Sequence, residues 1–566
     1  VKINILHYNI AINLWVPGDS DNGKILCSWN HVMKYVQARN YVLAPFSELR
    51  IVTDDYYDNT QPPPTIKLLN TKADVTDLIP NMRGAAEIYG RELIQDAEYT
   101  IDEGEKLAVF TWVGCSLQVK GKVLQEYQGA DNAMKEYLNV INVLNAEREF
   151  ASVKRIQGPR VLITGSPSSG KSSVSMLMCN YAVRSGWTPV FVEADPRAST
   201  DKKPLQFYPG TLGASVISTM TDEVPDNPLL YFYGYTDVQE NEQLYIKVSQ
   251  SMAATIEIMM EEALINQPNS RRSDVVNDMC KYVAASGMII NAPYFANRDI
   301  IVKLAKMFNV SMILVIDSPS VHQELVRTFD TIRDAHKGGI YDEMMEPNML
   351  GKLAFHDDSG IPSPNEADDT VAQEVQQDSA VRKEDVRDVI VLAVNKLEGV
   401  VPVDQERVKY LCFKIWRRYF DRPTNGEMHV IKFPMESVNL VTLESSRELS
   451  KDALPADDNG DFEKEEICAS QWIGDPVSLT NSILGISSSS EDIKLIPYCN
   501  LLGFFLVRAV EESTQPQEDD EENMGKDVTF TIEALCPIIY SPSALPPFLI
   551  VAGNQRSMKW QPNHLN

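Results

Sequence analysis

Residues 165–172 read Gly-Ser-Pro-Ser-Ser-Gly-Lys-Ser and fill every fixed position of the pattern Gly-x-x-x-x-Gly-Lys-Ser/Thr. A continuous apolar run, residues 161–164, precedes them, and residues 173–184 after them carry helical spacing. Glycines let the backbone curl so that successive N–H groups point inward at an anion, and the helix that follows adds the positive end of its dipole. The stretch therefore predicts a strand, a phosphate-binding loop and a helix, which together begin a P-loop domain.

We expect this loop to bind ATP together with Mg²⁺. In the pattern the lysine, here Lys171, reaches the β- and γ-phosphates, and the hydroxyl of Ser172 is a ligand of the metal ion. The residues expected to line the phosphates are Gly165, Ser168, Ser169, Gly170, Lys171, Ser172 and Ser173.

The central part of the chain has the composition of an α/β domain. Its apolar runs are continuous instead of alternating, and helical stretches separate them. The runs are residues 161–164, 190–193, 288–290, 312–316 and 389–394. Strands that are buried on both faces have this composition, so we expect a mostly parallel sheet with crossover helices in a P-loop domain at residues 157–425.

The flanking regions alternate apolar and polar residues between turn signals. Short alternating segments run from residue 41 to residue 119, and alternation returns after residue 426. We therefore expect an N-terminal β domain at residues 1–130, with residues 1–40 unplaced, and a C-terminal β domain at residues 426–566. Residues 131–156 carry helical spacing with interleaved charges and are expected to form a connecting helix.

Two acidic segments interrupt this plan. Residues 355–386 and 513–526 are rich in Asp, Glu, Gln, Pro and Ser and are too polar to bury, so we expect disordered insertions there. They contribute to a formal net charge of -27 at pH 7. A chain this acidic repels nucleic acid and anionic membranes at long range, so any contact with RNA needs a local basic groove.

The cysteines and histidines form no metal-binding pattern. Eight cysteines stand singly without a Cys-x-x-Cys pair, and the seven histidines contain no His-Glu-x-x-His. Such cysteines are typical of small buried side chains in a reducing compartment, the cytosol or the nucleus. No apolar run approaches the 18 or so residues that a membrane-spanning helix needs, so we expect no contact with a membrane core.

The carboxylate that completes the site is open from the pattern alone. Asp195 ends the apolar run at 190–195, and Asp317 ends the run at 312–317 with the better spacing for a Walker B aspartate. Carboxyl ends of parallel strands are where ligands bind, but Asp is also a common helix N-cap. Asn291 ends a third run, at a position where an Asp is expected. On pattern alone, Asp195 and Asp317 stand equal.

A GTPase is the alternative raised by Asn395-Lys396-Leu397-Glu398, which is similar to the guanine-reading sequence Asn-Lys-x-Asp. A GTPase should also have Asp-x-x-Gly after a strand. Residues 291–294 read Asn-Ala-Pro-Tyr and do not supply it. The sequence therefore disfavours this alternative.

Several blocks in order resemble the Clp-one family, whose members are subunits of the eukaryotic pre-mRNA cleavage and polyadenylation factor related to RNA 5′-hydroxyl kinases. The clearest are Gly-Ala-Ala-Glu-Ile-Tyr-Gly-Arg-Glu-Leu at 84–93, Ala-Val-Phe-Thr-Trp-Val-Gly-Cys at 108–115 and Gly-Pro-Arg-Val-Leu-Ile-Thr-Gly at 158–165. Later blocks are residues 286–291, 417–420 and 548–553. The likeness runs from about residue 41 to residue 560 outside the acidic insertions, and it implies the same three-part architecture.

The resemblance also assigns site residues. It implies that Glu48 and Lys106 of the N-terminal domain help to enclose the nucleotide. It implies that Asp195 is the aspartate that binds magnesium and acts as the general base, which favours Asp195 over Asp317. An Asn at the position of Asn291 also occurs in relatives, so that residue does not count against the site.

The chain departs from the kinase members of the family in its catalytic parts. Kinases carry Asp-x-Gly-Gln at the catalytic aspartate, whereas Asp195 is followed by Pro196 and Arg197. Kinases also use lid arginines, whose positions fall on Lys409 and Phe413. Removal of such an arginine costs about 10³–10⁵ in rate. Substitutes near those positions are Lys414, Arg417 and Arg418, which otherwise form a solvated helix face.

The leading hypothesis is therefore a non-catalytic subunit of the 3′-end cleavage factor, in which Asp195 is vestigial and bound ATP-Mg forms part of the structure. Such a protein would work in the nucleus, dock a scaffold subunit, and contact RNA only indirectly or weakly. The alternative is an active ATP-dependent RNA 5′-hydroxyl kinase with Lys409, Lys414 and Arg417 as candidate lid residues. A third possibility is another kind of P-loop ATPase.

Overall fold

The computed structural model describes a large part of the chain in separate stretches. They are residues 38–54, 62–70, 84–129, 133–197, 205, 207–220, 228–265, 283–294, 296–337, 389–402, 404–421, 429–445, 467–489, 492–515, 527–536, 540 and 545–552. They divide into two compact units. One lies within residues 1–86 and 93–129, and the other within residues 87–92 and 130–566.

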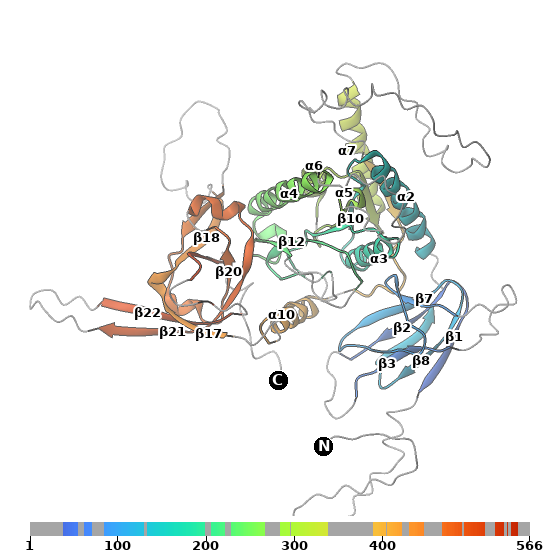
Figure 1. The fold of residues 1–566 in the computed structure, drawn as a ribbon, viewed down its shortest axis with the longest axis horizontal. Helices are drawn as coiled ribbons and strands as arrows, with labels where there is room; N and C mark the ends of the chain where they lie inside the picture. The colour runs from blue at the N-terminus through green and yellow to red at the C-terminus, as the bar shows by residue number, and fades with distance from the viewer. Residues whose placement is uncertain are drawn as a thin grey trace, which may run out of the picture. The chain divides into compact units, whose positions relative to one another are not determined.

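The first unit is built from antiparallel strands (Figure 1). One sheet has the order β1-β8-β3-β6, with the strands β1 (Arg39–Leu43), β8 (Cys115–Lys120), β3 (Thr65–Leu68) and β6 (Glu98–Thr100). In the other, β2 (Ser47–Val52) pairs with both β7 (Lys106–Thr111) and β9 (Gln125–Gly129). The apolar side chains of Leu49, Val109 and Leu117 are fully buried, as alternating strands that pack face to face require.

The second unit contains a seven-stranded sheet in the order β13-β12-β11-β14-β10-β15-β16. Its strands are β10 (Arg160–Gly165), β11 (Val190–Glu193), β12 (Thr211–Val216), β13 (Leu229–Phe232), β14 (Met288–Asn291), β15 (Met312–Ile316) and β16 (Ile390–Val394). The neighbouring strands β11, β14, β10, β15 and β16 run parallel to one another, whereas β12 pairs antiparallel with both β11 and β13. Every residue of β11, β14 and β15 is buried, which explains the continuous apolar runs.

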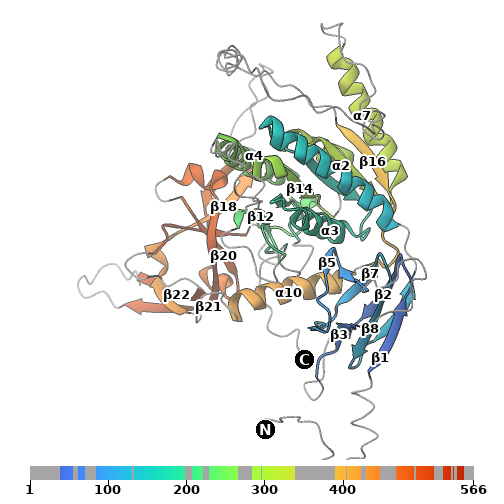
Figure 2. The same cartoon turned by 45° about the vertical axis from the view of Figure 1, so that its right-hand side comes forward.

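Helices flank this sheet (Figures 1 and 2). They are α2 (Ala133–Lys154), α3 (Lys171–Arg184), α4 (Glu242–Ile265), α5 (Val283–Ser286), α6 (Arg298–Met307), α7 (Pro319–Lys337) and α10 (Gln405–Asp421), with the short 3₁₀ helix η1 at Val238–Glu240. The helix α6 illustrates the local rules. Asn297 caps it by accepting a hydrogen bond of 2.9 Å from the N–H of Ile300, and Ile301 and Leu304 bury its apolar face.

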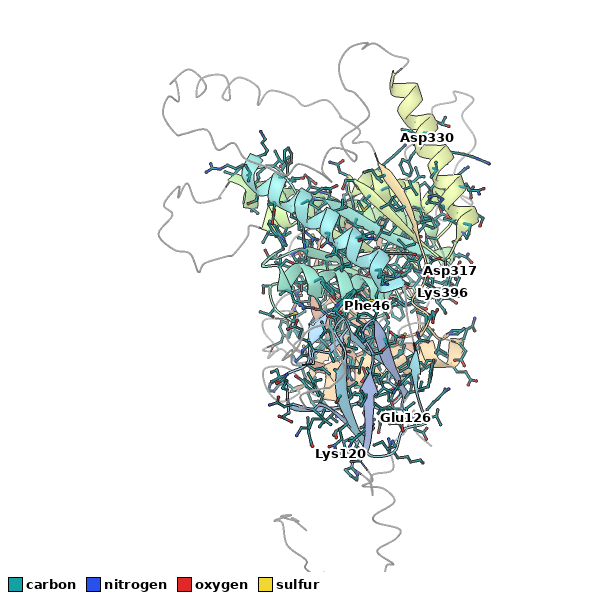
Figure 3. The ribbon with its side chains drawn as sticks, turned by 90° about the vertical axis from the view of Figure 1, so that its right-hand side faces the viewer. Phe46, Lys120, Glu126, Asp317, Asp330 and Lys396 are labelled. Atoms are coloured by element: carbon teal, nitrogen blue, oxygen red, sulfur yellow. The ribbon has the colours of Figure 1, made fainter. Side chains whose placement is uncertain are left out.

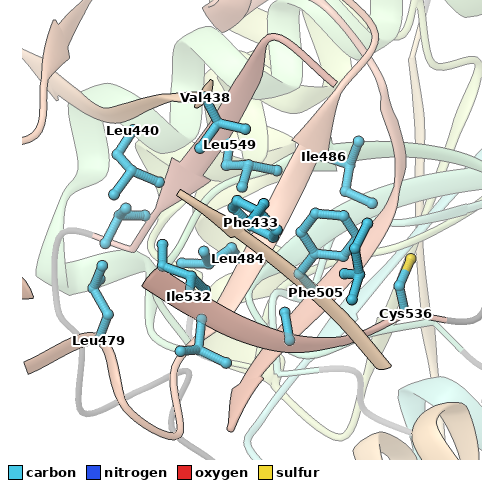
Figure 4. Close-up of a cluster of buried hydrophobic side chains, with 14 residues drawn as sticks. Phe433, Val438, Leu440, Leu479, Leu484, Ile486, Phe505, Ile532, Cys536 and Leu549 are labelled. Atoms are coloured by element: carbon cyan, nitrogen blue, oxygen red, sulfur yellow. The ribbon is translucent and has the colours of Figure 1, made fainter. Parts of the chain in front are cut away.

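The C-terminal part of the same unit is a second seven-stranded sheet, in the order β17-β22-β21-β20-β23-β18-β19. Its strands are β17 (His429–Pro434), β18 (Asn439–Ser445), β19 (Ile467–Gln471), β20 (Ile483–Ser487), β21 (Leu501–Gln515), β22 (Asp527–Cys536) and β23 (Phe548–Val551), joined by the short helices η2 (Met435–Ser437), η3 (Pro476–Leu479) and η4 (Ile493–Tyr498). Figure 4 shows its apolar core, in which Phe433, Leu484 and Phe505 are almost fully buried.

Aromatic side chains join α10 to this C-terminal sheet. The ring of Phe504 lies 4.9 Å from Trp416 and 5.5 Å from Tyr419, measured between centroids. The N–H of Phe504 donates a hydrogen bond of 3.1 Å to the hydroxyl of Tyr419. Burial of such large aromatic surfaces fixes the position of α10 against the rest of the unit.

The expected fold class is confirmed: β domains flank an α/β core whose sheet is mostly parallel. The antiparallel pair β12 and β13 has no counterpart in the sequence analysis. Residues 513–515, expected in an acidic loop, lie in β21 and pair with β22, because the ladder runs on to Gln515 and Asp527. The segments at 355–386 and 516–526, and residues 1–37, lie outside the described residues.

Candidate nucleotide-binding site

The loop between β10 and α3 has a backbone that only glycine accommodates at two positions. Gly165 has a φ of 152°, and a Cβ added there would lie 2.3 Å from the carbonyl oxygen of Ile316. Gly170, the residue before α3, has a φ of 89°, and its Cβ would lie 2.9 Å from the side chain of Val400. A side chain at either position would therefore collide with a neighbour, and a glycine-dependent backbone of this kind lets successive N–H groups point at an anion.

The N-terminus of α3 contributes further donors. The first intrahelical hydrogen bond runs from the N–H of Val174 to the carbonyl of Gly170, at 2.9 Å. Residues 171–173 therefore sit in the first turn, where N–H groups point out of the helix end and the dipole favours an anion. The hydroxyl of Ser169 is buried and has no hydrogen-bond partner in the described part of the chain. A phosphate oxygen would satisfy it.

Lys171 lies in the interior, with only 6% of its surface exposed. Its Nζ is 3.4 Å from the carbonyl oxygen of Tyr294 and 5.8 Å from the centroid of that ring. Burial lowers the pKa of Lys171; the charge of Arg197 lowers it further, and Asp195 counteracts both. An anion in the loop would offset the cost of keeping this ammonium group charged.

The ends of β11 and β14 bring three polar residues together beside Ser172. Asn291 donates hydrogen bonds through Nδ2 to Oε1 of Glu193 at 2.8 Å and to the hydroxyl of Ser172 at 3.4 Å. The same Oε1 accepts the N–H of Asp195 at 3.1 Å. Glu193 and Asn291 are paired in register on adjacent parallel strands, so the sheet itself positions this group.

Asp195 is buried, with 4% of its surface exposed. Its Oδ1 accepts a hydrogen bond of 3.1 Å from the N–H of Arg197. Burial raises the pKa of Asp195, and this hydrogen bond and the charges of Lys171 and Arg197 oppose the rise. The carboxylate therefore lies in the electrostatic field of the loop lysine, as a residue near bound Mg²⁺ would.

Arg197 lies against the same ring as Lys171. Its guanidinium carbon is 3.8 Å from the centroid of Tyr294, and its Nη2 is 3.2 Å from Oδ2 of Asp237. Its carbonyl oxygen lies 3.6 Å from the sulfur of Cys412 on α10. Sequence reasoning missed Glu193, Tyr294 and Asp237. Only Glu193 carried a signal, since it ends an apolar run two residues before Asp195.

The other candidate carboxylate, Asp317, is engaged elsewhere. Its Oδ2 forms an ion pair of 2.8 Å with Lys396, and Figure 3 labels the two residues side by side. Asn395 donates through Nδ2 to Glu136 on α2 at 2.7 Å. Asn395 and Lys396 thus both have protein partners, in keeping with the sequence argument against a guanine-reading loop.

A two-stranded hairpin fixes the far end of α3. It consists of β4 (Glu87–Ile88) and β5 (Arg91–Glu92). The buried carboxylate of Glu87 accepts hydrogen bonds from the hydroxyl of Tyr181 at 2.6 Å and from Arg184 at 2.8 Å. Gly90 has a φ of 81°, and a Cβ there would lie 2.8 Å from the ring of Tyr181. These contacts hold the helix that carries Lys171.

Two family models match the chain. The N-terminal beta-sandwich domain of polyadenylation factor matches residues 43–151, and the P-loop of mRNA cleavage and polyadenylation factor CLP1 matches residues 165–338. The chain belongs to the Clp1 family.

Relatives and solved structures agree with the two matches. The chain is 34% identical over 250 residues to the polyribonucleotide 5′-hydroxyl-kinase Clp1 of Homo sapiens and to that of Bos taurus, with 44% of this chain and 54% of each relative covered. It is 31% identical over 279 residues to the CLP1 homologue of Nematostella vectensis, with 48% of this chain and 61% of that protein covered. The chain thus spans about half the length of the mammalian relatives it matches.

Two solved complexes share the fold. A Clp1p–Pcf11p structure that addresses their extended interface and ATP loss in a point mutant aligns with a TM-score of 0.59 at 16% identity, covering 92% of this chain and 99% of that one. A wild-type Clp1p–Pcf11p complex aligns with a TM-score of 0.60 at 17% identity, covering 92% and 98%. Among the described residues no helix has the length and apolar character to cross a bilayer.

The residues expected to enclose the nucleotide belong to the first unit. Glu48 on β2 is buried and forms an ion pair with Arg50. Lys106 begins β7 and is exposed, and its backbone pairs with Val52. These contacts are all made inside the first unit. The assignment of Glu48 and Lys106 to the nucleotide stays a proposal.

The candidate lid residues lie on α10, on different sides of the helix. Cys412, whose sulfur contacts Arg197, marks the side that faces the site. Lys409 is three residues earlier and shares that side, whereas Lys414 is two residues later and lies opposite. Arg417 is exposed and lies on neither side. Lys409 is exposed as well, and the assignment of a lid residue among the three stays a proposal.

The residues present fit ATP with Mg²⁺. The loop offers glycine-dependent backbone donors, the buried hydroxyl of Ser169 and the ammonium group of Lys171. In the described residues no group of three or more His, Cys, Asp or Glu could hold a metal ion alone. Mg²⁺ in nucleotide sites needs only one or two protein ligands, since phosphates and water supply the rest, and Ser172 with Asp195 is such a set.

Proposed function

We propose that the protein is an ATP-binding, non-catalytic subunit of the pre-mRNA 3′-end cleavage and polyadenylation factor, in which bound ATP-Mg forms part of the fold. One observation carries the proposal. The Gly-Lys-Ser loop is intact around Lys171, whereas Asp195, the aspartate that acts on the charge of that lysine, is buried and accepts a hydrogen bond from the backbone of Arg197.

Holding a nucleotide and transferring its phosphoryl group make different demands. Tight binding needs the loop, the helix N-terminus and the lysine. Transfer also needs a base that reaches the acceptor hydroxyl and a cation on the transferring group. Here the positions of the kinase lid arginines carry Lys409 and Phe413, and the residue two after the aspartate is Arg197 instead of a glycine. The residues that binding needs are present, whereas the residues that phosphoryl transfer also needs are altered.

The bound nucleotide would stabilise the surface that docks a protein scaffold. The solved complexes of Clp1p with Pcf11p, which share this fold, support a scaffold subunit of the Pcf11 kind as the partner. Membership of a cleavage and polyadenylation factor family supports action in the nucleus. The net charge of -27 supports contact with RNA through partners instead of through the bulk surface of this chain.

The second candidate function is an RNA 5′-hydroxyl kinase, which the relatives are named for. Retention of Asp195 and the position of Lys409 favour it. In that case Asp195 would accept the proton of the substrate hydroxyl, and Lys409 would stabilise charge on the transferring group.

The two functions are separated by phosphoryl transfer from γ-labelled ATP to an oligonucleotide with a 5′-hydroxyl. The proposal expects no transfer above that of the Lys171→Ala, Ser172→Ala double variant. Transfer that Asp195→Ala abolishes and that a distant control, Asp299→Ala, leaves unchanged would overturn it in favour of the kinase. Steady release of phosphate from ATP without RNA would instead identify a different P-loop ATPase.

A further inference from the structure

We propose that Arg197 binds the terminal phosphate of the bound nucleotide and makes the site select ATP over ADP. The inference rests on the proposed function, because it requires a site that holds ATP. It deepens that function by naming the residue that would retain the triphosphate.

The position of Arg197 is the first argument. Its guanidinium lies 3.8 Å from the centroid of the Tyr294 ring, and Nζ of Lys171 lies 5.8 Å from the same centroid. One aromatic ring thus contacts both cations. Since the P-loop lysine reaches the β- and γ-phosphates, a second cation on this ring is on the side of the terminal phosphate.

The second argument is the hydrogen-bonding capacity of the guanidinium. It carries five donors in a fixed fork that matches phosphate oxygens. Among the described residues, one of them is used, by Nη2 on Oδ2 of Asp237 at 3.2 Å. The side chain keeps 19% of its surface exposed. Donors remain for an anion, while Asp237 and the ring hold the group in place.

The third argument is the balance of charge. The ionisable groups around the loop lysine are Lys171, Arg197, Asp195, Glu193 and Asp237. Glu193 accepts hydrogen bonds from Asn291 and from the backbone of Asp195, so its charge is compensated by neutral donors. With Mg²⁺ beside Asp195 and Asp237 paired with Arg197, the charge of Lys171 and the remaining donors of Arg197 are available to the terminal phosphate, which ADP lacks.

The backbone of Arg197 offers a competing explanation for its presence. Its N–H bonds Asp195 and its carbonyl contacts Cys412, so the residue could merely hold the loop against α10. Those contacts survive any change of side chain. A truncated side chain therefore separates the phosphate-binding role from the loop-holding role.

The test compares the affinities of ATP-Mg and ADP-Mg by calorimetry on full-length protein stripped of nucleotide with EDTA and phosphatase. For Arg197→Ala we expect ATP to bind about 10- to 100-fold more weakly, the loss typical of a charge-assisted hydrogen bond, with ADP affinity nearly unchanged. Arg197→Lys should recover part of the loss, because it keeps the charge without the fork. The control Arg298→Ala removes an exposed arginine on α6 and should change neither affinity.

Equal loss of ATP and ADP affinity in Arg197→Ala, or no loss, would overturn the inference. ADP binding reports that the loop has folded. If Arg197→Ala binds neither nucleotide measurably, so that its loop has not folded, Arg197→Lys and Arg197→Gln replace it in the test. A ratio of ATP to ADP affinity equal to that of wild type in both of these variants contradicts the inference. A wild-type protein that binds neither nucleotide would instead refute the proposed function.

Discussion

The backbone N–H of Arg197 donates a hydrogen bond of 3.1 Å to Oδ1 of Asp195. This bond closes a tight turn at the end of β11 and occupies one lone pair of the carboxylate that would otherwise act as base. The turn lies at the carboxyl edge of the parallel sheet, where ligands bind. It links Arg197, which stands where the kinase pattern Asp-x-Gly-Gln has its glycine, to the carboxylate of Asp195.

The pH dependence of stability should report the burial of Asp195. Burial raises the pKa of Asp195 above the ordinary value of an aspartate. The folded state then binds more protons than the unfolded state between the two pKa values, so the free energy of unfolding falls as pH rises through that window. Asp195→Asn removes this effect. In nucleotide-free protein with EDTA, the variant should gain thermal stability relative to wild type as pH rises from about 4 to about 7.

The control for that measurement is Asp317→Asn, whose carboxylate is 43% exposed and paired with Lys396. Its effect should be small and should not favour the variant at neutral pH. If the thermal stability of wild type instead rises relative to that of Asp195→Asn as pH rises, the pKa of the Asp195 carboxyl is lowered in the folded protein. That result would contradict the effect of its burial.

Loss of the phosphate loop should destabilise the protein by mass action. A ligand present at a hundredfold excess over its Kd stabilises the folded state by about 2.7 kcal/mol. Lys171→Ala with Ser172→Ala should therefore lower the melting temperature in ATP-Mg and weaken capture of a Pcf11-like scaffold. Without nucleotide the double variant should melt no lower than wild type. If neither melting nor capture changes, the structural role of ATP is refuted.

The buried ion pair between Glu87 and Arg184 on α3 should contribute more to stability than the exposed ion pair between Glu92 and the same arginine. Arg184 pairs with both Glu87, whose side chain is 3% exposed, and Glu92, which is 63% exposed. Glu87→Ala removes the buried carboxylate that accepts hydrogen bonds from Tyr181 and Arg184 and should cost about 2–3 kcal/mol. Glu92→Ala should cost less than about 1 kcal/mol. Denaturant unfolding of the two variants provides the comparison, and equal costs would contradict the packing described.

Cysteine alkylation should follow burial. Burial raises the pKa of Cys115 to about 11 and that of Cys179 to about 12, so their thiolate fractions at pH 8 are minute. Cys468 is exposed. Iodoacetamide followed by peptide mass spectrometry should modify Cys468 long before the other two. Early modification of Cys179 in native protein would show that α3 opens readily from the sheet.

The phosphate loop and the parallel strands were predictable because their signals are local. A strand buried on both faces must be apolar throughout, and residues 190–193 are both a predicted run and the bounds of β11. The antiparallel strands β12 and β13 were not predicted, because Thr211–Val216 and Leu229–Phe232 carry no distinctive pattern of apolar and polar residues. Their place in the sheet depends on pairing partners distant in sequence.

The surroundings of the site were less predictable for a similar reason. Tyr294 meets Lys171 and Arg197 only because three segments converge at one edge of the sheet. The choice between Asp195 and Asp317 could not be made from spacing. It depends on which carboxylate lies near Lys171 and which is paired with Lys396.

The most direct test of the central claim is the nucleotide recovered from purified protein after denaturation, separated by chromatography and quantified per chain. A protein that holds ATP without turning it over should release close to one equivalent of intact ATP, and the Lys171→Ala, Ser172→Ala double variant should release none. Recovery of ADP, or of no nucleotide from the wild-type protein, would contradict the account.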